Sequence, residues 1–359
     1  MSRRARRDGA PGDQPPGDQP PGRGGGASPS RASSGLASRE DGWPDLCLAL
    51  SGGVGGAKLA LGLSRVLAAD RLVVVANTGD DFEHLGLHVA PDLDTVMYNL
   101  AGLANPTTGW GRESETWSFL GALEELGGET WFRLGDRDLA VHVERTRRLR
   151  EGATLSQVTA ELCARLGVAP RVAPMSDQAV RTMVGTPDGE LAFQHYFVRD
   201  RCEPEVTGFR FAGIESARPS PVFAHALGDP ALGAIVICPS NPFVSVDPIL
   251  ALTGVEDALR AAAAPIVAVS PIIVGAALKG PAAKMMRELR LPVTAVEVAR
   301  HYADRGLLDG FVLDRQDEAL AADLEALQVA VLVADTVMVT LDHRERLARE
   351  VLALARELS

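Results

Sequence analysis

Acidic side chains are concentrated in one short stretch of this sequence, NTGDDFEHLGLHVAPDLDTV, at residues 77–96. Carboxylates beside a glycine turn suit a hard divalent cation, because Mg²⁺ binds one or two carboxylates and completes its shell with water and substrate phosphate. We therefore predict a magnesium site here, with the candidate metal ligands and catalytic acids Asp80, Asp81 and Asp94. The sequence leaves open which of Asp80 and Asp81 faces the metal. A plain solvated acidic loop is the alternative interpretation.

Zinc is not the expected metal. His84 and His88 have the spacing of two ligands on one helix face, but Gly86 lies between them and no helix start signal precedes them. The cysteines form no C-x-x-C pair, which argues against a structural zinc or a disulfide framework.

A glycine-rich segment, SGGVGGAK, occupies residues 51–58. Glycines let backbone amides approach a phosphate, and a following helix N-terminus adds favourable partial charge. Ala57 interrupts the Gly-Lys-Ser/Thr of a Walker loop, and Asn77 stands where a dinucleotide site needs an acid. We predict that a phosphate or diphosphate binds here, with a tight strand-to-helix turn as the alternative. The candidate residues are Gly52, Gly53, Gly55, Gly56 and Lys58.

Two later stretches, GWGRESETW (109–117) and WFRLGDRDLA (131–140), combine tryptophan with arginine. This combination suits a flat aromatic ligand that carries anionic groups, although Trp117 and Trp131 are equally well explained as core residues. The short loops PMSD, PSNP and SPIIVG present Ser and Asn side chains that suit a nucleobase or ribose. Each of these loops, taken alone, is also explained as a tight turn.

The elements that position these residues are short apolar runs alternating with helical periods, which is typical of a parallel sheet covered by helices. We predict a helix begun at Pro91, with Asp92 as its cap and Asp94 free to face a cleft. The expected fold is α/β, a doubly wound, mostly parallel, Rossmann-like sheet with an inserted helical and β-hairpin subdomain at about residues 135–225. Ligands of such sheets bind beyond the carboxyl ends of the strands, near the switch point of strand order. The predicted strands are residues 46–50, 71–76, 233–238, 265–270, 291–296, 310–314 and 329–335; helices are expected at 57–67 and 154–167, and a hairpin across 180–198.

The chain has 359 residues and a formal net charge of −11, which argues against a broad nucleic-acid surface. Residues 1–44 are basic and rich in Pro and Gly, so we predict a disordered tail followed by a folded domain over residues 45–359. The sequence contains neither an apolar signal core nor a run long enough to span a membrane, so a cytoplasmic location without membrane association is expected.

Taken in order, these motifs resemble the 2-phospho-L-lactate transferases of coenzyme F-420 biosynthesis, which include the actinobacterial phosphoenolpyruvate transferases. The resemblance covers residues 46 to about 345 and includes LSGGVGGAKLALGL, NTGDD, PDLDTVMYNL, GWG, LGDRDLA, PMSD, PSNP and AVSPIIVGAALKGPAAKMM. It implies a magnesium-dependent transfer of a phospho-three-carbon-acid group, phosphoenolpyruvate or 2-phospholactate, from a guanosine diphosphate-activated donor. The acceptor would be the ribityl hydroxyl of the deazaflavin Fo, GMP would be released, and a homodimer is the family expectation.

The resemblance also implies roles for individual residues. The deazaflavin-contacting positions of the family fall on Asp94 and Arg133, and Asp94 would help to accept the hydroxyl proton. We assign guanine recognition to Ser176, Asp177 and Asn241. Two other classes stay open: a non-catalytic nucleotide-binding regulator resembling the gluconeogenesis-factor family, and a nicotinamide-dependent oxidoreductase. The GWG and GDRD stretches count against the regulator, and the broken fingerprint counts against the oxidoreductase.

Overall fold

The computed structural model describes residues 42–359, which belong to one compact unit, Arg39–Ser359. The tail predicted over residues 1–44 therefore lies almost wholly outside the described residues. Trp43 and Pro44 are described, and the Arg71 guanidinium donates hydrogen bonds to the backbone carbonyls of both. The last residues of the predicted tail thus contact the folded domain.

Seven parallel strands form the main sheet, in the order β14-β13-β10-β9-β1-β2-β5. The strands are β1 (Leu46–Ser51), β2 (Leu72–Ala76), β5 (Arg171–Pro174), β9 (Leu232–Ile237), β10 (Ile266–Val269), β13 (Gly310–Asp314) and β14 (Ala330–Ala334). Six of the predicted strands are thereby confirmed. The prediction at residues 291–296 was wrong, because Thr294 caps a helix there by accepting a hydrogen bond from the Glu297 amide at 3.2 Å. Strand β5 was not predicted.

Side chains alternate between the two faces of the sheet, so each strand contributes to two hydrophobic cores. In β1, Leu48 and Leu50 face one core while Cys47 and Ala49 face the other. The first core is covered by α6 (Pro221–Leu227), α8 (Val255–Ala261), α9 (Ala282–Glu288) and α10 (Ala295–Ala303). The second is covered by α1 (Gly53–Val66), α2 (Pro91–Leu100), α5 (Leu155–Arg165) and α12 (Leu341–Leu358). The doubly wound α/β fold is confirmed.

The order of the strands changes direction at β1. From β1 the chain moves outward through β2 to β5, and it then returns to β9 on the other side of β1. The loops that follow β1 and β9 meet at this point, where the Gly52 amide donates to Ser240 Oγ at 3.0 Å and that hydroxyl donates to the Gly52 carbonyl at 2.8 Å. This is the switch point at which an open α/β sheet binds its ligands.

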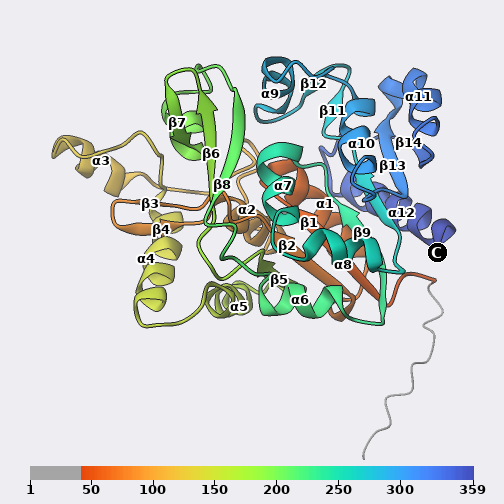
Figure 1. The fold of residues 1–359 in the computed structure, drawn as a ribbon. Helices are drawn as coiled ribbons and strands as arrows, with labels where there is room; N and C mark the ends of the chain where they lie inside the picture. The colour runs from red at the N-terminus through yellow and green to blue at the C-terminus, as the bar shows by residue number, and fades with distance from the viewer. Residues whose placement is uncertain (1–41) are drawn as a thin grey trace, which may run out of the picture. The chain divides into compact units, whose positions relative to one another are not determined.

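Two insertions project from the sheet (Figure 1). Between β2 and β5 lie the hairpin of β3 (Phe82–His84) and β4 (Leu87–Val89), then α2, α3 (Ser118–Glu125), α4 (Asp136–Arg150) and α5. Between β5 and β9 lies an antiparallel sheet of β6 (Arg181–Thr186), β7 (Gly189–Ala192) and β8 (Gly208–Ala212), followed by α6. The subdomain expected over residues 135–225 is thus divided by β5, which pairs with β2 in the main sheet.

The local signals were read correctly at several positions. Helix α2 starts at Pro91, α5 carries the capping box of Thr154 and Gln157, and the hairpin turn lies between β6 and β7. The hairpin is shorter than predicted, since a π-helical turn occupies His195–Arg199. The remaining short elements are β11 (Ile272–Ile273), β12 (Ala276–Ala277), α7 (Asp247–Leu250) and α11 (Ala321–Glu325), with turns of 3-10 or π-helix at Ala69–Arg71, Pro242–Val246 and Arg315–Leu320.

Across residues 42–359, no helix is both long enough and apolar enough to cross a lipid bilayer.

Candidate active site

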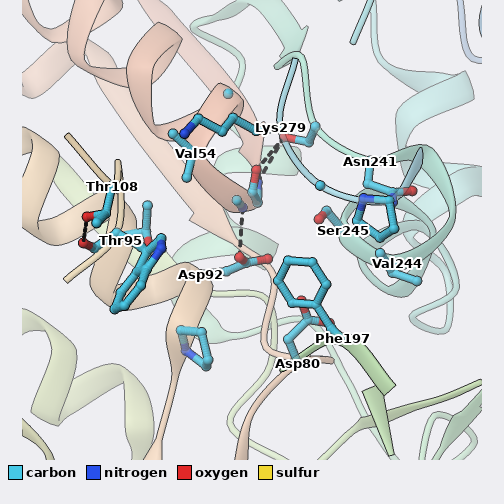
Figure 2. Close-up of a pocket in the computed structure, with 18 of the residues that line it drawn as sticks. Val54, Asp80, Asp92, Thr95, Thr108, Phe197, Asn241, Val244, Ser245 and Lys279 are labelled. Atoms are coloured by element: carbon cyan, nitrogen blue, oxygen red, sulfur yellow. Dashed lines mark hydrogen bonds between the residues drawn. The ribbon is translucent and has the colours of Figure 1, made fainter. Parts of the chain in front are cut away.

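A cavity of about 630 Å³ opens at the switch point, beyond the carboxyl ends of the strands. Its walls come from the β1–α1 turn, α2, α4, the π-helical turn, and the loops after β9, β10 and β14. Figure 2 shows Thr95 and Thr108 on one side of this cavity and Asn241 and Ser245 on the other, with Asp92 between them. Segments that lie far apart in the sequence therefore share one cavity.

The glycine-rich segment is the first turn of a helix rather than a loop. Helix α1 begins at Gly53, four residues earlier than predicted, and Gly53 has a φ of +62°, which disfavours other residues. A Cβ on Gly55 would lie 2.3 Å from the carbonyl oxygen of Pro239, so the turn needs glycine to pack against the β9 loop. Val54 and Gly55 remain as first-turn residues whose N–H groups have no intrahelical partner and line the cavity. Both readings of this segment thus have a physical basis.

Asp92 joins the two segments that carried the strongest sequence signals. Its carboxylate accepts a hydrogen bond from the Gly53 amide at 2.7 Å and another from Asn77 Nδ2 at 2.9 Å. The prediction that Asp92 caps its own helix was wrong, because no side chain caps α2. The Asp92 carboxylate instead caps α1 by accepting the hydrogen bond from the Gly53 amide. Asp92 thus lies at the positive end of the α1 dipole and lines the cavity.

Asp80 lies in the same part of the cavity (Figure 2). It is buried, and its Oδ1 atom has no hydrogen-bond partner among residues 42–359. Burial, followed by the nearby negative charge of Asp92, raises the pKa of Asp80 well above its ordinary value. Burial also raises the pKa of Asp92, to about 6. The two carboxylates therefore form a buried acidic pair that lacks a countercharge in this part of the chain.

The neighbouring Asp81 has a different environment. Its Oδ2 atom lies 3.0 Å from His88 Nε2, and Asp81 does not contribute to the cavity wall formed by residues 42–359. Backbone direction separates these adjacent acids: one points into the cavity and the other pairs with the histidine of strand β4.

Asp94 lines the cavity from α2 but is held in an ion pair. Both of its oxygens accept from the Arg145 guanidinium, and His142 Nδ1 lies 3.6 Å from Oδ2. Burial opposes the charge on Arg145, yet Asp94 more than offsets this effect, so the pKa of Arg145 is raised. Tyr98 donates to Asp138 at 2.6 Å in the same group. Asp94, Asp138 and His142 are close enough together to hold a cation, although the guanidinium already neutralises Asp94.

Arg133 and Trp110 line the same cavity as Asp94. The guanidinium of Arg133 lies 4.5 Å from the ring centroid of Trp117, and Trp110 is 45% exposed. Two acidic side chains cap the helices next to these residues. The Glu115 carboxylate accepts hydrogen bonds from the first-turn amides of α4, and the Asp136 carboxylate accepts hydrogen bonds from the first-turn amides of α3. The wall thus offers an aromatic face and a cation without an acidic partner among the described residues.

Trp131 is part of an aromatic group rather than of the hydrophobic core. Its ring centroid lies 5.1 Å from that of His84 and 5.0 Å from that of His195, and its side chain contributes to the cavity wall. Neither Trp131 nor Trp117 is fully buried.

The residues assigned to guanine recognition are separated by the fold. Asn241 lines the cavity, where its Oδ1 accepts the Phe243 amide at 3.1 Å. Ser176 and Asp177 lie outside the cavity wall of residues 42–359; Asp177 accepts the Ser156 amide at 2.7 Å and so stabilises the start of α5. The structure therefore brings only Asn241 of these three to the cavity.

Several cavity residues were not identified from the sequence. Lys58 was predicted, and its Nζ donates a hydrogen bond to the Met338 carbonyl at 3.0 Å. Lys279, in the loop after β12, was not predicted and also lines the cavity. Phe197, on the unpredicted π-helical turn, also lines the cavity. Arg145 carries no motif signal, because its role depends on a partner 51 residues away.

Comparisons with known proteins identify the family of this chain. Residues 47–356 match the family model of 2-phospho-L-lactate transferase CofD. A phosphoenolpyruvate transferase of Streptomyces griseus is 41% identical over 314 residues, covering 86% of this chain and 98% of that protein. The one from Mycolicibacterium smegmatis is 38% identical over 305 residues, covering 80% and 93%. A solved structure from the upf0052 family of Bacillus halodurans, at 14% identity, has a TM-score of 0.59 and covers 86% of this chain and 99% of that one, a likeness of fold alone. This chain belongs to the 2-phospho-L-lactate transferase CofD family.

Proposed function

We propose that this protein transfers a phosphoenolpyruvyl group from a guanosine diphosphate-activated donor to the ribityl hydroxyl of the deazaflavin Fo, with release of GMP. Membership of the CofD family supports a transferase of coenzyme F-420 biosynthesis. The enolpyruvyl donor is favoured over the lactyl one because relatives of 37–41% identity are named phosphoenolpyruvate transferases. The observation that carries the proposal is the buried pair of Asp80 and Asp92 at the N-terminus of α1.

Magnesium is the cation that this pair fits. Asp80 Oδ1 lacks a partner among residues 42–359, and the two carboxylates raise each other's cost of ionisation in a buried site. A hard cation relieves both conditions. Asp94 would have to leave its ion pair with Arg145 to bind it, and Asp81, which has one carboxylate oxygen against His88, does not line the cavity formed by residues 42–359. We therefore propose Asp80 and Asp92 as the carboxylates that hold Mg²⁺, which supplies charge neutralisation to the diphosphate when it is bound.

The N-terminus of α1 would receive the diphosphate. The Gly52 and Gly53 amides already donate to Ser240 and Asp92, so the available donors are the amides of Val54 and Gly55. Asn241, on the far side of the switch point, remains a candidate contact to the guanosine.

The acceptor would enter from the side of Trp110 and Arg133. An exposed indole suits a flat deazaflavin ring, and the guanidinium suits its carbonyl oxygens. The cavity wall also includes Asp94, whose carboxylate is held in a fixed orientation by its hydrogen bonds from Arg145. We propose that Asp94 orients the ribityl hydroxyl and accepts its proton.

In the reaction, the hydroxyl oxygen forms a bond to the distal phosphorus of the donor. The bond between that phosphorus and the bridging oxygen breaks, and GMP leaves with the bridging oxygen. The residues contribute mainly by aligning the two reactants and by keeping the site electrostatically prepared for the charge.

The proposal is tested by incubating the protein with Fo, MgCl₂ and either guanylylated phosphoenolpyruvate or guanylylated 2-phospholactate, with mass spectrometry for GMP and the deazaflavin adduct. We expect the enolpyruvyl adduct, its loss in EDTA, and a loss of at least about a hundredfold in turnover for Asp80→Asn. Asp81→Asn is the matched control and should retain activity, because that carboxylate pairs with His88. A protein that binds nucleotide but forms no adduct with either donor would be a regulator, and the proposal would be wrong.

A further inference from the structure

Two lysines line the cavity and an arginine lies behind them on a helix that packs against α1, so that three cations from distant segments are close together. Lys58 lies on α1, Lys279 follows β12, and Arg344 lies on α12. Lys58 and Lys279 line the cavity, and Arg344 is close enough that its charge, after burial, lowers the pKa of Lys58. Figure 2 shows Lys279 at the end of the view where Val54 lies, with Asp80 at the other end.

None of these three cations forms an ion pair with an acid in residues 42–359. Among residues 42–359, the one hydrogen bond of Lys58 goes to the Met338 carbonyl, which leaves two of its three N–H groups available in this part of the chain. Arg344 has a buried Nε without a hydrogen-bond partner in the described chain. Like charges held together without a counterion are unfavourable, so a cluster of this kind at a cavity wall favours an anionic ligand.

The surroundings of the cations indicate the size of that anion. The adjoining wall is the segment Thr336–Val339 between β14 and α12, together with Leu278. Its side chains are mostly apolar and small to medium in size. This end of the cavity therefore offers an apolar surface with cations beside it, which suits a short carbon unit that carries a charged group.

Under the proposed function, on which this inference rests, the donor carries one anionic group that GDP and Fo both lack: the carboxylate of the three-carbon acid. The phosphates would be bound by the α1 amides and by the magnesium ion that Asp80 and Asp92 would hold, but a carboxylate taken from water needs a cation of its own. We propose that Lys58 and Lys279, with Arg344 behind them, bind the carboxylate of the donor's three-carbon acid. These residues then make the enzyme select the guanylylated three-carbon acid over free GDP.

Calorimetry without Fo tests this inference, because binding is measured while no transfer can occur. The two titrants are the guanylylated acid and GDP, which differ by the three-carbon acid alone. For Lys279→Met we expect about tenfold weaker binding of the guanylylated acid and less than about twofold change for GDP, as expected for the loss of a charged hydrogen bond. Lys279 is exposed and makes no hydrogen bond with residues 42–359, so this variant should fold normally.

Lys58→Met should give the same selectivity, and Lys58→Arg should recover most of the binding. Arg349→Met, on the same helix as Arg344 but paired with Glu345, is the matched control and should bind both titrants like the wild type. If the Lys variants bound GDP and the guanylylated acid with equally reduced affinity, the three cations would bind a phosphate rather than the carboxylate. If their affinity for the guanylylated acid were unchanged, the cations would not contact the donor. Either result overturns the inference while leaving the wild-type transfer assay unaffected, so the two failures are distinguishable.

Discussion

The buried acidic pair predicts an unusual dependence of stability on pH. In the metal-free protein, burial raises the pKa of Asp92 from its ordinary 3.8 to about 6. The folded protein therefore holds a proton that the unfolded chain has released, and the stabilisation is fully present below pH 3.8 and is lost as the pH rises through about 6. Between pH 5 and pH 7.5 the free energy of unfolding should fall by about 1.4 kcal/mol from this group.

The assay is urea unfolding in EDTA at several pH values, with Asp92→Asn as the reference. The substitution also disturbs the bonds to Gly53 and Asn77, but that effect does not depend on pH and shifts the curve without changing its slope. The difference between the two proteins thus isolates the titration. The Asp92 charge also raises the pKa of Asp80, so the substitution removes part of the pH dependence that comes from Asp80 as well. The difference in pH dependence between the two proteins should therefore be at least about 1.4 kcal/mol.

Magnesium should reverse the trend in the wild type. Protons compete with the cation for the two carboxylates, so MgCl₂ should stabilise the protein more at pH 7.5 than at pH 5 and have little effect on Asp92→Asn. If the free energy of unfolding changed with pH in the same way for the two proteins in EDTA, the reasoning would be refuted, because Asp92 would then have an ordinary pKa in the folded protein.

Other substitutions test the remaining geometry. Asp94→Asn should destabilise the protein by about 3–5 kcal/mol in urea, because it leaves the buried Arg145 without a countercharge, and near-normal turnover at saturating Fo would exclude its proposed role. Gly55→Ala should cost about 1–3 kcal/mol, since its Cβ would meet a carbonyl oxygen of the β9 loop at 2.3 Å. Gly121→Ala, in the exposed α3 with open space around it, should be neutral or stabilising by up to about 1 kcal/mol, and equal losses at both glycines would contradict the packing argument. Asp177→Asn should leave the donor KM within about twofold, whereas a large rise would return this residue to guanine recognition.

Local sequence patterns predicted the features that depend on local physics. Continuous apolar runs identified six strands of the sheet, and Pro91 and Thr154 marked two helix starts, because capping and burial act within a few residues. Strand β5 escaped notice since it is a short edge strand that ends in proline. Residues 291–296 are apolar enough to suggest a strand, but Thr294 and Glu297 have the spacing of a helix start signal, and the helix forms instead.

By itself the sequence determined the fold class and, through the order of its motifs, the family to which the chain belongs. Tertiary structure alone decided which acids face the cavity and which contact other side chains within the protein. Asp81 contacts His88 across the β3–β4 hairpin, and Asp94 is paired with Arg145, which is 51 residues away. Neither contact can be predicted from the residues next to the two acids in the sequence. The Asp80–Asp92 pair likewise exists only because the folded chain brings the end of β2, the start of α2 and the N-terminus of α1 together. Charge and solvation depend on distances in space, and only the folded chain sets those distances.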